Sequence, residues 1–274
     1  MIFTKYKSIV MIFPIVFLSV VLTSCQEKQD LNRQEVAKAE ILVEEIEGGN
    51  DAIKERQELA NQGDPDAIKE RQELANQGDP DAQLELGAMY ANGEGVSQDY
   101  TKAFQWFEKA ANQGMAEAQF NLGRMYRTGE GVSQDYTKAV QWYEKSANQG
   151  MANAKTDLGV MYRTGEGVRQ DNVKALHFYT EAANQGNVNS QYNLGVMYAN
   201  GQGTSQDYTK AVPWFEKSAN QGMAEAQYNL GIFYDDGKGV RKDKAIAKEY
   251  FGKACDNGLQ FSCDEYKILS EQGY

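Results

Sequence analysis

The chain offers few residues for catalysis. It has 274 residues, with three cysteines and a single histidine, His177. A serine-hydrolase relay needs an imidazole that a third group holds in place, and His177 stands where similar segments of the chain carry Gln105 and Gln141. We therefore interpret His177 as a solvated side chain. A structural zinc site needs four ligands, and the cysteines lack such companions. No metal or cofactor is expected.

A second candidate for chemistry is a glycine-rich segment. The sequence MYRTGEGV occurs at 125–132 and again at 161–168. A phosphate-binding loop needs four residues between its glycines, followed by Lys and then Ser or Thr. The nearest match, GIFYDDGKG at 231–239, has five residues in the gap and a glycine after the lysine. GEG, GQG or GKG recurs every 36 residues, which a single active site would not require. We interpret the segment as a turn.

Residues 1–24 have the features of an export signal. Lys5 and Lys7 precede the apolar run SIVMIFPIVFLSVVL, which is too short for a stable transmembrane helix. The run stops at LTSC, which resembles the lipobox of bacterial lipoproteins and implies lipidation of Cys25. The alternative is a plain secretory signal with an incidental cysteine. Residues 26–50 are mostly polar and are interpreted as a tether.

Export would place the remaining cysteines in an oxidising compartment. There Cys255 and Cys263, separated by seven residues, are more often bridged than free. In the entropic model, a loop this short would stabilise the fold by roughly 2–3 kcal/mol. The formal net charge of -11 argues against a nucleic-acid partner, because phosphate binding depends on a basic surface.

The chain is an array of repeats, which must be recognised before any other feature of the fold. The pair LG stands at 86, 122, 158, 194 and 230. Helical periodicity in both halves of each unit predicts two amphipathic helices, with a glycine turn after each. The five units are 79–114, 115–150, 151–186, 187–222 and 223–258.

The unit at 115–150 shows the local logic. Gly129 is placed to end the first helix in a left-handed conformation, and Asp135 is placed to cap the second. Gly123 lies at the edge of the predicted core face, where a second backbone could come close. The predicted class is all-α.

These residues resemble the Sel-one-like repeat, a relative of the tetratricopeptide repeat. The resemblance rests on the order A-x-x-x-LG-x-MY-x-x-G-x-GV-x-x-D-x-x-KA-x-x-W-F/Y-x-K-A/S-A-N-x-G over 79–258. It implies a right-handed α/α superhelical solenoid that serves as an adaptor, and exported members often act in the bacterial envelope or meet host proteins. The ending KACDNGLQFSCDEY is similar to a cysteine-rich branch, in which a disulfide joins the second helix of one repeat to the first of the next. Residues 259–274 would form a capping helix.

Two features depart from the repeat. The 15-mer DAIKERQELANQGDP occurs twice in succession between 51 and 80, which predicts an irregular helical cap over 51–78. The alternative is a recent duplication that is partly disordered. The second departure is Pro213, which removes a helix hydrogen bond and is expected to kink its helix.

The cysteine-rich relatives have been associated with penicillin binding and β-lactam hydrolysis, so an enzyme must be considered. A serine β-lactamase needs Ser-x-x-Lys, and the chain contains none. RTG at 127–129 and 163–165 is similar to a Lys-Thr-Gly element but has no nucleophile to serve. We expect a non-enzyme. An envelope enzyme acting on peptidoglycan or β-lactams, and a glycan-binding module, are the alternatives.

A protein-binding surface is favoured instead, because stacked helical pairs form an extended concave face. The resemblance implies that first helices line it. Side chains there differ between units whereas core positions barely vary, and aromatic and arginine residues are good anchors for a partner. The alternative is unselected drift on a solvated face. The predicted partner is a protein or peptide, and the predicted binding residues are Phe120, Arg124, Arg127, Arg163, Tyr192 and Tyr228.

Overall fold

The structure, a computed structural model, describes residues 55–274. The expected signal, the expected lipidation site Cys25 and the expected tether lie outside the described residues. Ala60–Tyr274 forms one compact unit. Within the described residues the secondary structure is entirely helical, which confirms the predicted all-α class.

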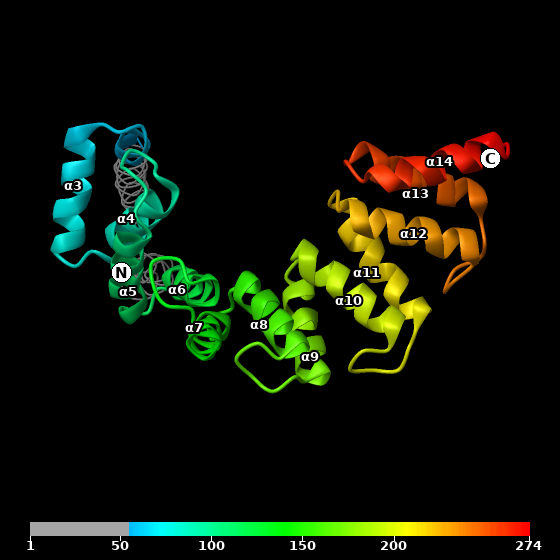
Figure 1. The fold of residues 1–274 in the computed structure, drawn as a ribbon, viewed down its shortest axis with the longest axis horizontal. Helices are drawn as coiled ribbons and strands as arrows, with labels where there is room; N and C mark the ends of the chain where they lie inside the picture. The colour runs from blue at the N-terminus through cyan, green and yellow to red at the C-terminus, as the bar shows by residue number, and fades with distance from the viewer. Residues whose placement is uncertain (1–54) are drawn as a thin grey trace, which may run out of the picture. The chain divides into compact units, whose positions relative to one another are not determined.

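Successive helices of this unit run back and forth along a row (Figure 1). Each 36-residue unit contributes a first and a second helix, both of 13 residues. Within a unit the two helices pack on one another, and each second helix packs on the first helix of the next unit. This nearest-neighbour packing is that of a solenoid. The helices are α3 Pro65–Asn76, α4 Pro80–Asn92, α5 Tyr100–Asn112, α6 Ala116–Thr128, α7 Tyr136–Asn148, α8 Ala152–Thr164, α9 Asn172–Asn184, α10 Val188–Asn200, α11 Tyr208–Asn220, α12 Ala224–Asp236, α13 Lys244–Asp256 and α14 Gln260–Glu271.

Local turn chemistry sets the ends of these helices, as the sequence predicted. Gly129 ends α6 in the left-handed conformation at φ 82°, and its amide donates to the carbonyl of Met125. Asp135 caps α7 by accepting a hydrogen bond from the amide of Lys138. These caps satisfy backbone groups that a helix end leaves without partners.

The second glycine of the loop explains why GEG, GQG and GKG recur. A Cβ built on Gly131 would lie 2.1 Å from the carbonyl oxygen of Tyr100, in the preceding unit. Gly131 also has a φ of 71°, which side-chain-bearing residues rarely adopt. The loop is therefore a turn that packs on the neighbouring unit, and the interpretation of MYRTGEGV as structural is confirmed.

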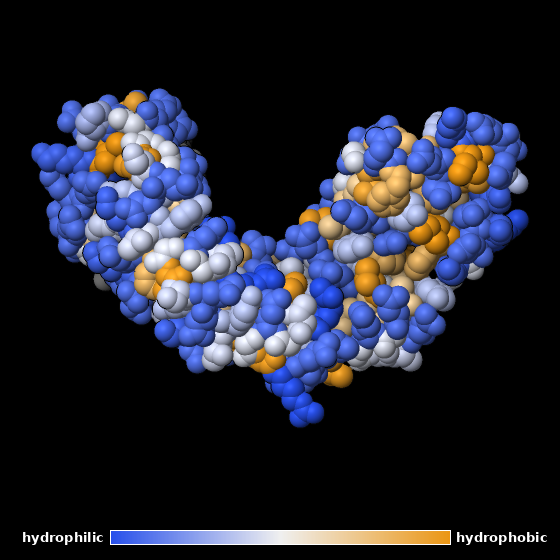
Figure 2. All heavy atoms as spheres, in the orientation of Figure 1, coloured by the Kyte–Doolittle hydropathy of each residue, from blue (hydrophilic) through white to orange (hydrophobic). Residues whose placement is uncertain are grey.

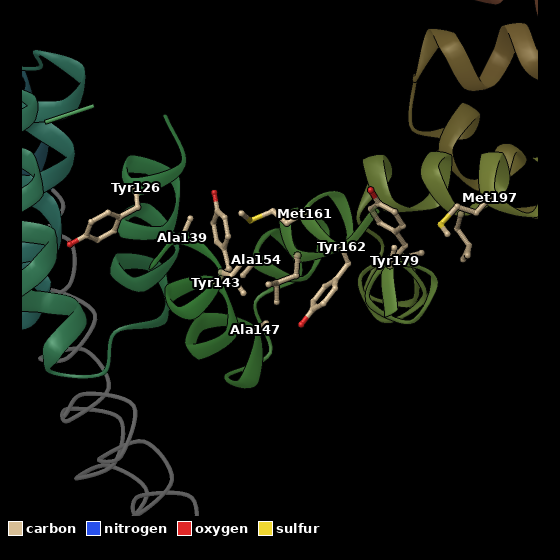
Figure 3. Close-up of a cluster of buried hydrophobic side chains, with 14 residues drawn as sticks. Tyr126, Ala139, Tyr143, Ala147, Ala154, Met161, Tyr162, Tyr179 and Met197 are labelled. Carbon is tan, nitrogen blue, oxygen red and sulfur yellow. The ribbon is translucent and has the colours of Figure 1, made fainter. Parts of the chain in front are cut away.

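The core lies between first and second helices. Ala118, Leu122 and Met125 of α6 are buried and lie on one side of the helix, in line with the helical periodicity of the sequence. The expectation for Gly123 was wrong in one respect, because the close neighbour is an aromatic ring and not a backbone. A Cβ on Gly123 would lie 2.6 Å from Cδ1 of Tyr143. Figure 3 shows Tyr143 and Tyr179 among the buried side chains of this core.

Glutamine side chains join neighbouring units. Gln149 donates to the carbonyl of Gly114 and to Oε1 of Gln119, both at 2.8 Å, and Gln119 donates to the carbonyl of Ala111 at 3.2 Å. Gln113 makes the same pair of bonds with Gly78 and Gln83 at the preceding junction. These bonds satisfy groups that packing would otherwise leave unpaired.

Both ends of the array differ from its middle. Asp64 caps α3 and Pro65 starts it, so the second 15-mer contains one helix in the described structure. At the other end a disulfide joins Cys255 of α13 to Cys263 of α14. Pro213 does not interrupt α11, which keeps the same length and the same Asp cap as α7. Its expected kink stays a prediction.

Candidate protein-interaction surface

The first helices carry the predicted partner-binding residues on one side, which we call the first-helix face. Its aromatic members also pack on the core. The ring centroids of Phe120 and Tyr143 are 5.7 Å apart, and those of Tyr192 and Phe215 are 5.8 Å apart. Tyr228 lies 5.5 Å from Phe251. Phe120, Tyr192 and Tyr228 are half-buried, so part of each side chain remains accessible to solvent.

The sequence predicted that the variable residues of this face are distinct from the core positions. That prediction was wrong in part, because some of these residues contribute to the core. Thr156, which occupies the position of Phe120 in the next unit, is buried, and its hydroxyl lies 2.7 Å from that of Ser190. The short side chain of Thr156 allows this contact between α8 and α10. The face changes from aromatic to small and polar at the third unit.

Arg127 connects two units of the array. Its Nε donates to Glu166 at 3.2 Å and its Nη1 donates to Asp157 at 3.3 Å. Asp157 belongs to α8 and Glu166 to the loop that follows it, whereas Arg127 belongs to α6. A planar guanidinium suits two carboxylates at once. Part of the charge of Arg127 is therefore used within the chain.

The other two predicted arginines have more donors left. Arg124 is exposed and makes no ion pair or hydrogen bond with the residues that the structure describes. Arg163 is half-buried, and its Nε lies 3.5 Å from the hydroxyl of Tyr179, a separation at which a hydrogen bond is weak. Arg124 and Arg163 thus have N–H donors without a strong partner among the described residues.

The second helices α7 and α9 contribute two tyrosine hydroxyls, of Tyr143 and Tyr179, near these arginines. Figure 3 shows the hydroxyls of Tyr143 and Tyr179 pointing to the same side, whereas that of Tyr162 points to the opposite side. The hydroxyl of Tyr143 is buried and makes no hydrogen bond of good geometry with the described residues. Burial raises the pKa of Tyr143 well above its ordinary value, and the charge of Asp157 raises it further. Burial also raises the pKa of Tyr179.

Asp157 is the buried charge of the region. Burial raises its pKa, and the nearby guanidinium of Arg127 lowers it. Sequence reasoning missed Asp157 and Tyr143. A signal was present, because other first helices carry Asn121, Asn193 and Asn229 at this position. We call the whole group the arginine–tyrosine cluster; it comprises Arg124, Arg127, Tyr143, Asp157, Arg163, Glu166 and Tyr179.

The side chains of the cluster are suited to hydrogen bonding and charge pairing. Its members can donate and accept hydrogen bonds and offer positive charge, but none is a serine or cysteine nucleophile beside a base. His177 is exposed, as predicted, and its Nε2 lies 3.3 Å from Glu181 on the same helix. Among residues 55–274, no group of three or more His, Cys, Asp or Glu side chains is placed to hold a metal ion.

Figure 2 shows hydrophilic residues over most of the visible face of the array, with apolar residues in separate groups that are more extensive toward the C-terminal end. In the part of the chain from 55 onward, no helix is both long and apolar enough to span a bilayer.

Comparison with known proteins identifies the array. The model of the Sel1 repeat matches residues 80–115, 116–151, 152–187, 188–223 and 224–259. These are the five units predicted from the sequence, displaced by one residue. No curated protein matches the chain.

The solved structures that resemble this one include the following two. The first is a protective antigen present in uropathogenic Escherichia coli strains that displays an SLR fold. It is 37% identical over 76% of this chain, with a TM-score of 0.74, and the chain spans only 44% of that protein. The second is a Sel1 repeat protein from Oxalobacter formigenes, which is 34% identical over 70% of this chain and 79% of its own, with a TM-score of 0.66. Sel1 repeat proteins are generally scaffolds for protein–protein interaction, and this chain belongs to the Sel1 repeat family.

Proposed function

We propose that the protein is an envelope scaffold, anchored by a lipid on Cys25, that binds a protein or peptide along its first-helix face. The arginine–tyrosine cluster carries the proposal. Charged and aromatic groups from α6, α7, α8 and α9 are brought together there, and they offer hydrogen bonds and positive charge to a ligand. A scaffold also agrees with the general role of the family.

The composition of the face supports a macromolecular partner. Half-buried aromatic rings at Phe120, Tyr192 and Tyr228 lie on three separate first helices. Rings and guanidinium groups that are already held by packing lose little freedom on binding, which makes them effective anchors. A partner that reaches several of them must be extended along the row of helices.

The proposed location rests on the N-terminal sequence. LTSC ending at Cys25 is similar to a lipobox, and Lys5 and Lys7 precede the apolar run. We propose that the array is exported and held at the periplasmic face of the outer membrane or at the cell surface. Cys25→Ser should then release the protein from the membrane fraction. Lipid anchoring would be contradicted if this variant stayed in washed membranes and the normal chain had the same mass as the variant, apart from the Cys-to-Ser change.

Photo-crosslinking tests the binding face. A photoreactive phenylalanine analogue would replace Tyr192 in the full chain, and a matched chain would carry it at Gln141 of α7, which is exposed and belongs to a second helix. We expect a discrete adduct with one protein at Tyr192 and none at Gln141 in intact envelopes. Equal adducts at both positions, or none at either, would contradict binding along the first-helix face.

A further inference from the structure

We propose that Arg124 and Arg163 together bind a carboxylate of an extended acidic segment in the partner. This inference rests on the proposed function, and it assigns the chemistry that the partner must bring. The carboxylate belongs to an Asp or Glu side chain or to a chain terminus of that segment. It binds on the first-helix face between α6 and α8, both of which pack on α7.

The distribution of basic residues carries the first step. From α4 to α12, the first helices contain only four basic side chains, namely Arg124, Arg127, Lys155 and Arg163. Arg127 is bound by Asp157 and Glu166, and Nζ of Lys155 lies 2.8 Å from Glu181. The guanidinium groups of Arg124 and Arg163 therefore supply the positive charge that remains for a ligand on this face.

The second step is that these arginines act on a common region. Nη1 of Arg127 in α6 lies 3.3 Å from Oδ1 of Asp157 in α8. Arg163 follows Asp157 in α8, and its Nε lies 3.5 Å from the hydroxyl of Tyr179. Arg124 is one turn before Arg127 on the same side of α6; burial raises the pKa of Asp157, and the charges of Arg127 and Arg124 both act against that rise. Asp157 thus lies within the electrostatic reach of both α6 arginines, and Tyr179 within that of Arg127 and Arg163.

The charge of the cluster favours a carboxylate over a phosphate. Its three arginines are opposed by Asp157 and Glu166, so its formal net charge is about +1, which matches a monoanion. The chain as a whole carries a formal charge of -11, and this field repels polyanions such as nucleic acid. A single carboxylate within a protein segment pairs with the positive charge of the cluster and is repelled least by the negative charge of the rest of the chain.

The experiment compares adducts at Tyr192 in three full-length chains. The first has all its arginines, the second carries Arg124→Gln with Arg163→Gln, and the third carries Arg169→Gln with Arg241→Gln. Arg169 and Arg241 are exposed residues of interhelical loops, so the third chain loses the same charge elsewhere. We expect the adduct yield to fall at least about tenfold in the second chain, as for two lost charge-assisted hydrogen bonds, and to stay within about twofold in the third.

A competition experiment identifies the ligand chemistry. A synthetic ten-residue peptide with blocked ends and a single Glu among Ala and Ser residues should reduce the adduct of the first chain, and the peptide with Gln in place of that Glu should not. An unchanged adduct in the Arg124 and Arg163 variant would overturn this inference and leave the proposed function intact. Absence of any adduct at Tyr192 in the first chain, or an adduct with nucleic acid or polysaccharide, would overturn both.

Discussion

The ring of Tyr143 occupies the space into which a side chain at Gly123 would project. A Cβ at Gly123 would come within 2.6 Å of the ring, and both residues are buried. The same arrangement recurs in the next unit, where a Cβ at Gly159 would lie 2.7 Å from Tyr179. The glycine of each LG pair thus determines how closely the two helices of a unit approach.

We predict that Gly123→Ala lowers the free energy of unfolding by about 1 kcal/mol, and by no more than about 2 kcal/mol. Overpacking a core costs about 1–3 kcal/mol, and the helix preference of alanine over glycine offsets roughly 1 kcal/mol of that cost. Urea unfolding followed by circular dichroism measures the difference. Gly252→Ala is the matched control, because its Cβ would lie 3.1 Å from the partly exposed ring of Tyr266, which can move. Equal losses for both variants would contradict the packing argument.

Tyr143→Phe is expected to leave stability unchanged or to raise it by about 1 kcal/mol. The variant removes a buried hydroxyl that makes no hydrogen bond of good geometry with the described residues, and burying such a group costs about 1–3 kcal/mol. The chain already has phenylalanine at the equivalent positions, Phe107, Phe215 and Phe251. A loss of more than 1 kcal/mol in urea unfolding would show that the hydroxyl is bound within the array.

The same substitution should change the response to alkaline pH. The pKa of Tyr143 is raised in the folded chain, so the folded state keeps the phenol neutral while the unfolded state ionises it above about pH 10. The stability that this tyrosine contributes is therefore complete below pH 10 and falls as pH rises, by up to about 1.4 kcal/mol per pH unit. Tyr143→Phe should make unfolding less steeply dependent on pH above 10, as urea midpoints at several alkaline pH values would reveal. An unchanged slope would contradict the raised pKa.

The sequence predicted helices and caps because these depend on neighbouring residues. Gly129 and Asp135 act on backbone groups within four positions of themselves, and a 36-residue spacing repeats such local signals. The outcome at Arg127 could not be predicted in this way. Its partners are 30 and 39 positions further along the chain, and their proximity depends on how one unit stacks on the next. Periodicity identifies an exposed helix side but does not show which of its side chains an adjacent unit engages.

Helical periodicity places Tyr143 on the core side of its helix and says nothing of its hydroxyl. Its ring is indeed buried, but the hydroxyl extends to the region of Arg127 and Asp157. Helical periodicity assigns one environment to a whole residue, whereas a tyrosine can place its ring and its hydroxyl in different ones. The binding roles predicted for Phe120, Arg124, Arg127, Arg163, Tyr192 and Tyr228 stay predictions.

Arg127→Ala should be destabilising in a way that depends on pH. Asp157 then loses its nearest positive charge while it remains largely buried, which raises its pKa beyond the value already raised by burial. A carboxyl group with a raised pKa stabilises the fold below its unfolded pKa and loses that contribution as pH rises. We expect a loss of about 1–3 kcal/mol near pH 7 and a smaller loss near pH 4.

A second substitution tests whether this loss comes from Asp157. Arg127→Ala with Asp157→Asn reproduces pairs that the chain contains elsewhere, Ala91 with Asn121 and Ala199 with Asn229, at the same separation of 30 positions. The double variant should regain most of the stability and lose the added pH dependence. If it is no more stable than Arg127→Ala in urea unfolding at pH 7, the buried carboxylate is not the cause.

Lys155 and Glu181 provide the last prediction, because together they replace a pattern found in the other units. The position of Lys155 is otherwise glutamine, and that of Glu181 is otherwise lysine. Nζ of Lys155 lies 2.8 Å from Glu181, and the Lys155 side chain is only 13% exposed. The side-chain oxygen of Gln185 accepts a further hydrogen bond from Lys155 when the Gln185 amide nitrogen donates to Gly150.

Glu181→Lys should cost about 1 kcal/mol or more, because it leaves the largely buried ammonium of Lys155 beside a like charge. Adding Lys155→Gln restores the arrangement of Gln119 with Lys145 and should recover that loss. Urea unfolding of the two single variants and the double variant gives the coupling energy, and a value near zero would mean that the exchange of charge between α8 and α9 has no energetic effect.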